Sequence, residues 1–285
     1  MPNLSHTQVE LLRPGGCSQQ HWFKYHPEGK RLAATVQSLL PIHFGFGSAV
    51  HSGIEFGLRH KMEYGEAPDI EEVLAAFDRA WGAEAQKANL DWGRATPAQL
   101  RSNGHKLLRL FFTEVAPQVA VPLGVERKIS VPIPDRPGWS FMGYLDFYGY
   151  DTQGRLIVWD AKTTSSGRVW NQVKADHEGQ PLAYAWLMGQ ADGVVPDGFV
   201  FVPLIQGLWG RECRVATIET RRTEAQLDAY EDLLRYAVDH IGAGLRIPNP
   251  DFTWHSNCPF RGLCTPWELE QPGDGFAPGD VELIL

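Results

Sequence analysis

Three strand patterns follow one another between residues 119 and 161, and they constrain the fold more than any other feature of this sequence. Residues 119–133 alternate and carry several β-branched side chains, residues 139–150 form a second strand candidate, and residues 155–161 contain the apolar run Leu156–Trp159. The turn-forming cluster Asp151–Gly154 separates the last two segments. Because strands joined by such short connections pair side by side, we predict an antiparallel meander.

Helical patterns surround this meander. Apolar residues recur at helical spacing before and after it, and two further strand patterns follow the next predicted helix. Thr96 followed by Pro97 is typical of a helix start, and Thr223 is a candidate cap. The order predicts an α/β fold with a mixed central sheet flanked by helices and an N-terminal helical elaboration. The predicted helices are Ser5–Leu12, a long one from Gly47, Glu71–Trp81, Leu100–Val115, Gln180–Met188 and Thr223–Ile241, and the further strands are Phe199–Ile205 and Cys213–Ile218.

The composition is that of a globular protein. With 285 residues, 43% of them hydrophobic, the chain can bury the core of one elaborated domain. It has no apolar run of about 20 residues that could span a membrane and no basic-then-apolar leader pattern at Met1–His6, so we expect a cytoplasmic protein. A net charge of −8 argues against a protein that coats DNA through bulk positive charge, but not against a nuclease, whose carboxylates hold cations.

Two acids and a lysine meet where the last two predicted strands pair. Asp160 follows the apolar run directly, and Lys162 lies two residues later, on the same face of a strand. A three-residue loop at residues 152–154 would place Asp146 opposite Asp160, whereas a two-residue loop would put the acids on opposite faces. Adjacent carboxylates repel each other unless they bind a cation. Such a pair fits Mg²⁺, which polarises a phosphate and activates water, the chemistry of phosphodiester hydrolysis.

An Asp-x-Lys triplet alone is weak evidence, because most isolated examples are surface ion pairs. The context of Asp160 favours a site, since it stands at the end of an apolar strand, where ligands bind in α/β sheets, and a second acid lies at hairpin spacing. Several aromatic side chains could stack DNA bases, although core packing is the simpler interpretation for most of them. These are Trp159, Trp170, Tyr184 and Trp186.

Four motifs resemble the nuclease domain of the RecB/AddB group in the PD-(D/E)XK nuclease superfamily, and they are similar to those of CRISPR-associated RecB-like exonucleases and phage-encoded nucleases. Each motif is weak by itself, but four in the same order are fairly specific. The resemblance extends from about the first predicted helix to the cysteine-bearing tail, and it implies a restriction-endonuclease-like fold. In chain order the motifs are Gly47-x-x-x-His51, Gly143-x-x-Asp146, Asp160-Ala161-Lys162-Thr163 and Gln180-x-x-x-Tyr184.

The resemblance also implies roles for these residues. Asp146 and Asp160 would bind a divalent metal, with the Ala161 carbonyl as an extra ligand. His51 would be a further ligand, which favours Mn²⁺ or Mg²⁺. Lys162 would be the catalytic lysine.

Three other polar residues lie in or beside the motifs. Gln180 and Tyr184 are one helical turn apart and share a face, and the resemblance implies that they contact the DNA backbone or the edge of the active site. Glu126, on the first predicted strand, either supports the metal site or is a solvated carboxylate.

The cysteines resemble a second element of this group, which in some members holds a [4Fe–4S] cluster through one N-terminal and three C-terminal cysteines. Cys17, Cys258 and Cys264 match three of these positions, and His255 stands at the fourth. Three interpretations stay open: a cluster with one histidine ligand, a Cys₃His Zn²⁺ site, or no metal, with the cysteines as buried packing residues. Cys213 lies in a predicted strand, and we interpret it as a core residue.

One integrated domain with three parts is predicted. Residues 1–118 would form a helical part that carries Cys17 and His51, residues 119–250 the nuclease core, and residues 251–285 a cysteine-bearing tail that packs back on the N-terminus. A metal shared by the first and last parts would close a very long loop and fix the tail.

The sequence therefore predicts a metal-dependent DNA nuclease, with an exonuclease on DNA ends or single strands as the favoured form, in DNA recombination, repair or phage DNA processing. DNA is the expected partner, recombination or repair proteins are candidate partners, and no oligomeric state is indicated. The alternatives are a catalytically silent DNA-binding or scaffold module of the same fold and a zinc-stabilised interaction protein. Retention of Asp146, Asp160 and Lys162 favours the enzyme.

Overall fold

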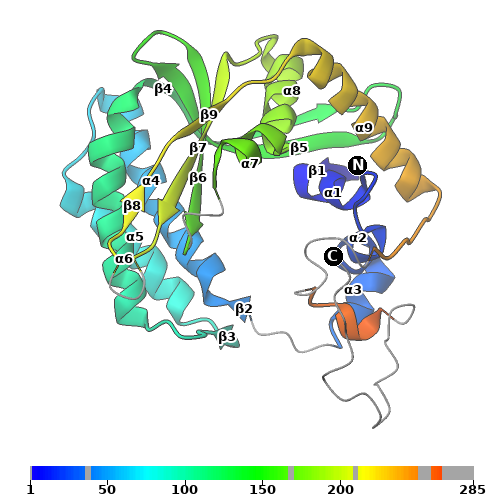
Figure 1. The fold of residues 1–285 in the computed structure, drawn as a ribbon, viewed down its shortest axis with the longest axis horizontal. Helices are drawn as coiled ribbons and strands as arrows, with labels where there is room; N and C mark the ends of the chain where they lie inside the picture. The colour runs from blue at the N-terminus through cyan, green and yellow to red at the C-terminus, as the bar shows by residue number, and fades with distance from the viewer. Residues whose placement is uncertain (1, 36–39, 166–169, 208–210, 250–257, 265–285) are drawn as a thin grey trace, which may run out of the picture. The chain divides into compact units, whose positions relative to one another are not determined.

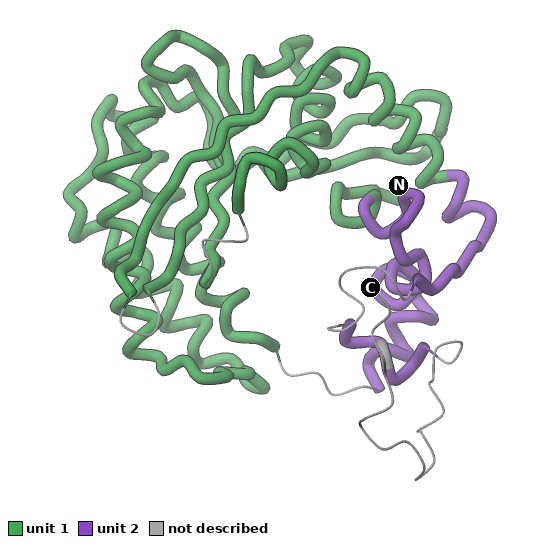
Figure 2. The backbone as a smooth tube through the Cα atoms, in the orientation of Figure 1, with its two compact units in different colours: residues 1–9, 39–238 green, residues 10–38, 239–285 purple. Residues whose placement is uncertain are grey.

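The computed structural model describes residues 2–35, 40–165, 170–207, 211–249 and 258–264. These residues fall into two compact units, each built from segments that are distant in the sequence (Figure 2). The first unit comprises residues 1–9 and 39–238, and the second comprises residues 10–38 and 239–285. The three-part domain organisation expected from the sequence stays a prediction.

A seven-stranded mixed sheet forms the centre of the first unit (Figure 1). Strands β4, β5 and β6 pair antiparallel in chain order, which confirms the predicted meander. Strand β7 then joins β6 in parallel, β8 and β9 pair antiparallel with β7, and β1 pairs in parallel with β5. The strands are β1 (Asn3–Ser5), β4 (Val119–Pro132), β5 (Ser140–Asp151), β6 (Leu156–Thr164), β7 (Gly198–Ile205), β8 (Arg214–Val215) and β9 (Ile218–Thr220).

The β5–β6 hairpin has the three-residue loop that the sequence analysis left open as one of two possibilities. The backbone N–H of Asp151 donates to the carbonyl of Arg155 at 3.0 Å, and the residue before Arg155, Gly154, has a φ of +76°, a conformation that favours glycine. The Asp151 carboxylate accepts hydrogen bonds from the N–H groups of Gln153 and Arg155, which fixes the turn. The resulting register pairs Tyr150 with Leu156 and Phe147 with Trp159, so Asp146 and Asp160, each one residue beyond the last pair, are brought together.

Helices α4 (Ile42–Tyr64), α5 (Ile70–Ala85) and α6 (Pro97–Leu110) lie together beside the sheet (Figure 1). Their apolar faces and the inner residues of β5, β6 and β7 form one core, in which the Phe147 and Trp159 rings stack 5.8 Å apart. Burial of each such large apolar side chain contributes about 1.5–3 kcal/mol. The Thr96 side chain accepts a hydrogen bond from the N–H of Gln99, which confirms the predicted cap of α6.

Helix α4 begins at Ile42, so the start predicted at Gly47 is wrong. Glycine is a poor helix former, so the helix propensity of a segment with Gly45 and Gly47 is too low to predict the first turns of this helix. The reason for glycine in α4 is close packing: a Cβ on Gly53 would lie 2.9 Å from the Leu108 side chain, and one on Gly47 would lie 3.0 Å from Thr163 Oγ1. Helix α4 therefore lies against both α6 and the end of β6.

Helices α7 (Gln172–His177), α8 (Gln180–Asp192) and α9 (Glu224–Gly242) follow β6 and β9 in the chain. Pro181 occupies the first turn of α8, as predicted. Thr223 caps α9 by accepting from the N–H of Gln226, whose side chain accepts in return from the N–H of Thr223. The single strand predicted for Cys213–Ile218 is wrong: two short strands, β8 and β9, pair with different parts of β7.

Shorter elements complete the described residues. In the first unit, β2 (Leu40–Pro41) pairs in parallel with β3 (Leu90–Asp91), and a π-helical turn (Phe111–Val115) and a 3₁₀ turn (Ala116–Gln118) link α6 to β4. None of the helices in the described residues is both long and apolar enough to cross a membrane. Helix α1 (His6–Leu12) begins in the first unit, and the second unit contains α2 (Ser18–Tyr25), α3 (Pro27–Ala33) and a 3₁₀ turn (Arg261–Leu263).

Candidate active site

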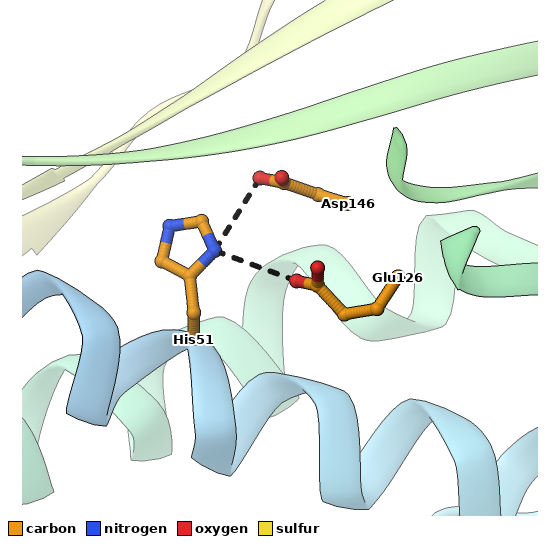
Figure 3. A group of neighbouring side chains, drawn as sticks. All are labelled: His51, Glu126 and Asp146. Carbon is orange, nitrogen blue, oxygen red and sulfur yellow. Dashed lines mark ion pairs between the residues drawn. The ribbon is translucent and has the colours of Figure 1, made fainter. Parts of the chain in front are cut away.

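Three side chains from different elements of the first unit converge beside the end of β6. His51 comes from α4, Glu126 from β4 and Asp146 from β5, and their ligand atoms lie within 4.8 Å of one another (Figure 3). His51 Nδ1 is 3.5 Å from Asp146 Oδ2 and 3.8 Å from Glu126 Oε1. One imidazole nitrogen and two carboxylate oxygens are a donor set that suits Mn²⁺ or Mg²⁺. Among the described residues, no other group of histidine, cysteine and acidic side chains meets this criterion.

The backbone of β6 holds both His51 and Asp146 in place. His51 Nε2 lies 2.9 Å from the carbonyl oxygen of Ala161, and because a carbonyl only accepts, Nε2 carries a hydrogen and Nδ1 faces the carboxylates. The N–H of Ala161 donates to Asp146 Oδ2 at 2.9 Å. The backbone N–H and carbonyl groups of Ala161 thus orient two candidate ligands. This role differs from that of a metal ligand, which the resemblance implies for the Ala161 carbonyl.

Negative charge predominates in this cluster, because the carboxylates of Glu126, Asp146 and Asp160 lie near one imidazole. Burial lowers the pKa of His51, but the contact with Glu126 and the negative charges of Asp146 and Asp160 outweigh burial and raise that pKa to about 9. Burial also raises the pKa of Asp146. A proton is therefore retained on the imidazole at neutral pH, in the place where a divalent cation would relieve the same repulsion.

Asp160 and Lys162 form the second half of the site. Asp160 is 1% exposed, and its Oδ2 lies 2.7 Å from Lys162 Nζ. Burial raises the pKa of Asp160 to about 6, Lys162 opposes this rise and Asp146 adds to it. Burial lowers the pKa of Lys162, but the charges of Asp160 and Asp146 outweigh it and raise that pKa above its ordinary value. Lys162 is therefore a cation in this arrangement, which suits it to contact a phosphate rather than to remove a proton.

Gln180 and Tyr184 lie together, as their spacing on one helix predicts, at the N-terminal end of α8. Gln180 Nε2 donates to Tyr184 Oη at 2.9 Å and also to Asp160 Oδ1 at 2.6 Å. Tyr184 is only 8% exposed, so its ring is part of the core. The bond from Gln180 to Asp160 is a contact that the sequence analysis did not predict, and it makes Gln180 a positioning residue for this acid.

Glu126 occupies a backbone conformation that non-glycine residues rarely adopt, with a φ of +49°. Such a conformation costs energy and persists only where its surroundings impose it, often at functional sites. Glu126 follows a register shift between Pro122 and Gly124 in β4, and its Oε1 lies 3.8 Å from His51 Nδ1. The sequence allows Glu126 to be either a supporting residue of the metal site or a solvated carboxylate. Its position in the cluster favours the first interpretation.

The sequence matches the family model of the PD-(D/E)XK nuclease superfamily over residues 3–265. The chain belongs to this superfamily. Its mixed sheet flanked by helices is the restriction-endonuclease-like fold of PD-(D/E)XK nucleases, as predicted, and these enzymes use divalent metals such as Mg²⁺ or Mn²⁺. The comparison with curated proteins gave no match.

Two solved structures are similar to this PD-(D/E)XK chain at low identity. One is the crystal structure of SSO0001, with 16% identity, a TM-score of 0.37, and coverage of 87% of this chain and 92% of that chain. The other is a protein from Eubacterium rectale described as a candidate exonuclease, with 12% identity, a TM-score of 0.48, and coverage of 90% of this chain and 87% of that chain.

An open pocket of about 410 Å³ lies against the cluster of His51, Glu126 and Asp146. Besides the three cluster residues it is lined by Gly47, Ser48, Ser52 and Glu55 of α4. Glu55 was not predicted, although its place one helical turn after His51 was a usable signal. Its carboxylate pairs with Arg59 Nε at 2.8 Å.

In the second unit of this PD-(D/E)XK chain, Cys17, Cys258 and Cys264 line one small pocket together with Phe23 and Phe260, whose rings stack 5.2 Å apart. The three thiols are free. Burial is the largest cause that raises the pKa of Cys258 and of Cys264, and the neighbouring Cys17 adds to both. The fourth predicted ligand, His255, lies outside the described residues.

Cys213 belongs to the first unit and packs against its apolar core, in agreement with its interpretation as a core residue. Its Sγ accepts a hydrogen bond from the N–H of Gly207 at 3.2 Å. The aromatic residues Trp159, Tyr184 and Trp186 are also core residues, each less than 9% exposed. Trp170 is half-buried, with Lys174 Nζ 5.0 Å from its ring centre.

Proposed function

We propose that this chain is a divalent-metal-dependent DNA exonuclease of the RecB/AddB type, acting on DNA ends or single strands in recombination, repair or phage DNA processing. The observation that carries the proposal is the convergence of His51, Glu126 and Asp146 beside the buried Asp160–Lys162 ion pair. A metal ligand set next to a fixed ammonium is what hydrolysis of a phosphodiester needs. Retention of both halves argues against a catalytically silent relative.

The residues divide the chemistry between them. His51, Asp146 and Asp160 would hold Mg²⁺ or Mn²⁺, with Glu126 and the Ala161 carbonyl beside them, and the metal would supply charge to the scissile phosphate and activate water. The Lys162 ammonium would contact the phosphate and orient the attacking water. Gln180 would hold Asp160 through its amide, and the open pocket in front of His51 would admit the phosphate.

The direct test is incubation of purified protein with DNA labelled at the 5′ or the 3′ end, as single and as double strands. We expect cleavage with Mg²⁺ or Mn²⁺ and none with EDTA, and release of labelled mononucleotides or short products from one end would identify an exonuclease. A circular DNA without ends is the control for the exonuclease, because only an endonuclease would cut it. Absence of metal-dependent cleavage on every substrate would contradict the proposal.

Gln180→Ala should lower kcat roughly tenfold with a small change in KM, because loss of a residue that orients a metal ligand typically costs 10–100-fold in activity or metal affinity. Without the Gln180 amide, Asp160 loses a hydrogen bond to its ionised form, so its pKa should rise further. The acidic limb of the pH–rate profile should therefore move to higher pH, a change that a merely structural role would not produce. Gln172→Ala, at the start of α7, is the matched control, and an unmoved acidic limb in Gln180→Ala would contradict the positioning role.

The cysteine pocket leads to a second proposal, that Cys17, Cys258 and Cys264 hold a structural metal or a [4Fe–4S] cluster with His255. Cys258→Ser should lower the melting temperature by several degrees while the cleavage rate per folded molecule stays near that of wild type. Metal analysis separates the candidates, since a cluster gives iron with sulfide and a brown colour, whereas Zn²⁺ is colourless. Cys213→Ser is the control for loss of a thiol elsewhere, and equal melting temperatures of Cys258→Ser and wild type would contradict a structural metal.

A further inference from the structure

A second pocket, of about 500 Å³, lies in the first unit where α4 begins. Pro41, Ile42 and His43 contribute one wall, the segment Asp91–Ala95 and the first turn of α6 contribute another, and Ser165 and Gln206 contribute a third. This size is within the range of pockets that hold small ligands. None of the roles assigned so far uses it.

Two elements connect this pocket to the candidate active site. His43 and His51 are eight residues apart on α4, which is about 12 Å along the helix axis. On the other side, Ser165 directly follows β6, the strand that carries Asp160 and Lys162, and the N–H of Gln206 donates to the carbonyl of Thr164 at 2.8 Å. The distance along α4 is that of roughly two to four nucleotides in a DNA strand.

Gln206 gives the pocket a polar side chain that can contact a ligand. It is 8% exposed, and its side chain makes no hydrogen bond to the residues that the structure describes, although its amide borders the pocket. Its carboxamide offers the pocket two N–H donors and one carbonyl acceptor. A ligand with donors and acceptors of its own, such as the edge of a nucleobase, would satisfy it.

Trp92 supplies a flat apolar surface in the same pocket. Its indole is half-buried and packs edge-on against Trp81, with ring centres 6.0 Å apart at 83°, so the plane of the Trp92 ring is held by the core. Arg94, two residues later, is exposed and has no ion-pair partner in the part of the chain that the structure describes. An oriented indole beside an unpaired guanidinium is the combination with which proteins stack a base and neutralise its phosphate.

The negative charge of Asp91 favours binding of a base over binding of a phosphate in this pocket. Its Oδ1 accepts from the N–H of Gly93 at 2.9 Å, so it is fixed at the wall of the pocket and repels a phosphate there. We propose that the pocket binds one unpaired base of the substrate DNA strand, stacked on Trp92 and hydrogen-bonded by Gln206, with the adjacent phosphate outside on Arg94. This inference rests on the proposed DNA nuclease function and deepens it, since it makes single-stranded DNA the form that the site holds.

The test is a scan of abasic positions in a fluorescein-labelled single strand of about 12 nucleotides, with binding followed by fluorescence anisotropy in EDTA so that metal-dependent cleavage does not occur. For the wild type we expect one position at which removal of the base weakens binding roughly tenfold. In Trp92→Ala, removal of the base at this position should weaken binding no more than at other positions. Tyr64→Ala, which removes an exposed aromatic side chain at the other end of α4, should keep the wild-type penalty. The same abasic penalties in Trp92→Ala as in wild type, or no penalised position at all, would overturn the proposal.

Two further variants keep the test decisive if Trp92→Ala does not fold. Gln206→Met keeps the shape of the side chain and removes its polar groups, and it should halve or further reduce the penalty at the same position. Arg94→Gln should weaken binding of all strands and reduce the slope of log Kd against log salt by about one, and an unchanged slope would overturn the role of Arg94. If the wild type cleaves DNA but shows no penalised abasic position, only the proposal of a base-binding pocket is contradicted. If the abasic effect is present and no substrate is cleaved, only the proposal of a nuclease is contradicted.

Discussion

Replacement of Lys162 by alanine or of Asp160 by asparagine is expected to reduce DNA cleavage about a thousandfold or more while the fold is retained. Lys162 is a cation beside the acids of the site, with its Nζ 2.7 Å from Asp160 Oδ2. A fixed charge that meets a developing negative charge in a site with little water accounts for two to three orders of magnitude in kcat. Loss of a metal ligand removes both the charge and the activated water that the metal provides.

The two variants should differ in metal binding, and this difference separates their roles. Saturating Mn²⁺ should raise the melting temperature of wild type and of Lys162→Ala, since a ligand that binds only the folded state stabilises it by about 2.7 kcal/mol at a hundred times its Kd. Asp160→Asn should show little of this shift. Lys174→Ala, at a half-buried lysine, and Asp232→Asn, at an exposed aspartate, are the matched controls, because both side chains have their ion-pair partners outside the site. Cleavage by Lys162→Ala at the wild-type rate would mean that the catalytic assignment is wrong.

The sequence limited the β5–β6 register to two possibilities, and the structure has the one with the three-residue loop, which brings the two acids together. A loop of three residues ending in Gly154 has a well-defined geometry, and the side-chain period of two then determines which residues share a face. Local rules of this kind work because the hairpin is short and its turn is stabilised by its own hydrogen bonds, here from Asp151. The position of His51 came from the resemblance instead, because no local rule connects a helix to a strand more than a hundred residues later.

Two contacts of the site and the start of α4 could not be predicted, because each depends on tertiary structure. Glu126 reaches His51 through a backbone conformation with positive φ, whereas regular strand alternation is the only rule available from sequence. Gln180 contacts Asp160 because α8 packs where β6 ends, which its spacing to Tyr184 does not reveal. The start of α4 was missed since glycines that allow close helix packing are indistinguishable in sequence from glycines that end a helix.

The short helices α2 and α3 were also missed, for a reason of scale. Each has only seven or eight residues, and α3 contains Pro27 and Gly29, so propensity alone does not support a helix. Contacts with the C-terminal segment of the same unit stabilise α2 instead: Arg246 lies over the Trp22 ring at 4.2 Å, and the N–H of Gln19 donates to the carbonyl of Ile247. A reading along the chain cannot detect contacts between residues more than two hundred positions apart.

The affinity for Mn²⁺ is expected to rise about fiftyfold between pH 7 and pH 9. His51 has its pKa raised to about 9 in the metal-free protein, against an ordinary value of 6.5, so at neutral pH the imidazole carries a proton that the metal must displace. The affinity therefore rises about tenfold per pH unit until the pH passes the raised pKa, and then levels off. Below about pH 6 the slope should steepen, because Asp160, whose pKa is raised to about 6, binds a second proton.

Proton release gives this expectation a direct measurement. Calorimetric titration of Mn²⁺ at pH 7.5, repeated in buffers of different ionisation enthalpy, should report release of about one proton per metal ion in wild type. His51→Gln should bind more weakly and release almost none, whereas His105→Gln, which changes a histidine paired with Asp78 away from the site, should behave as wild type. Because protonation of His51 stabilises the metal-free fold, the stability of that form should fall as the pH rises through 9, while the metal-bound form should not follow this decline. A metal affinity independent of pH between 7 and 9 would mean that the cation does not replace the proton on His51, and the cluster of His51, Glu126 and Asp146 would then be no metal site.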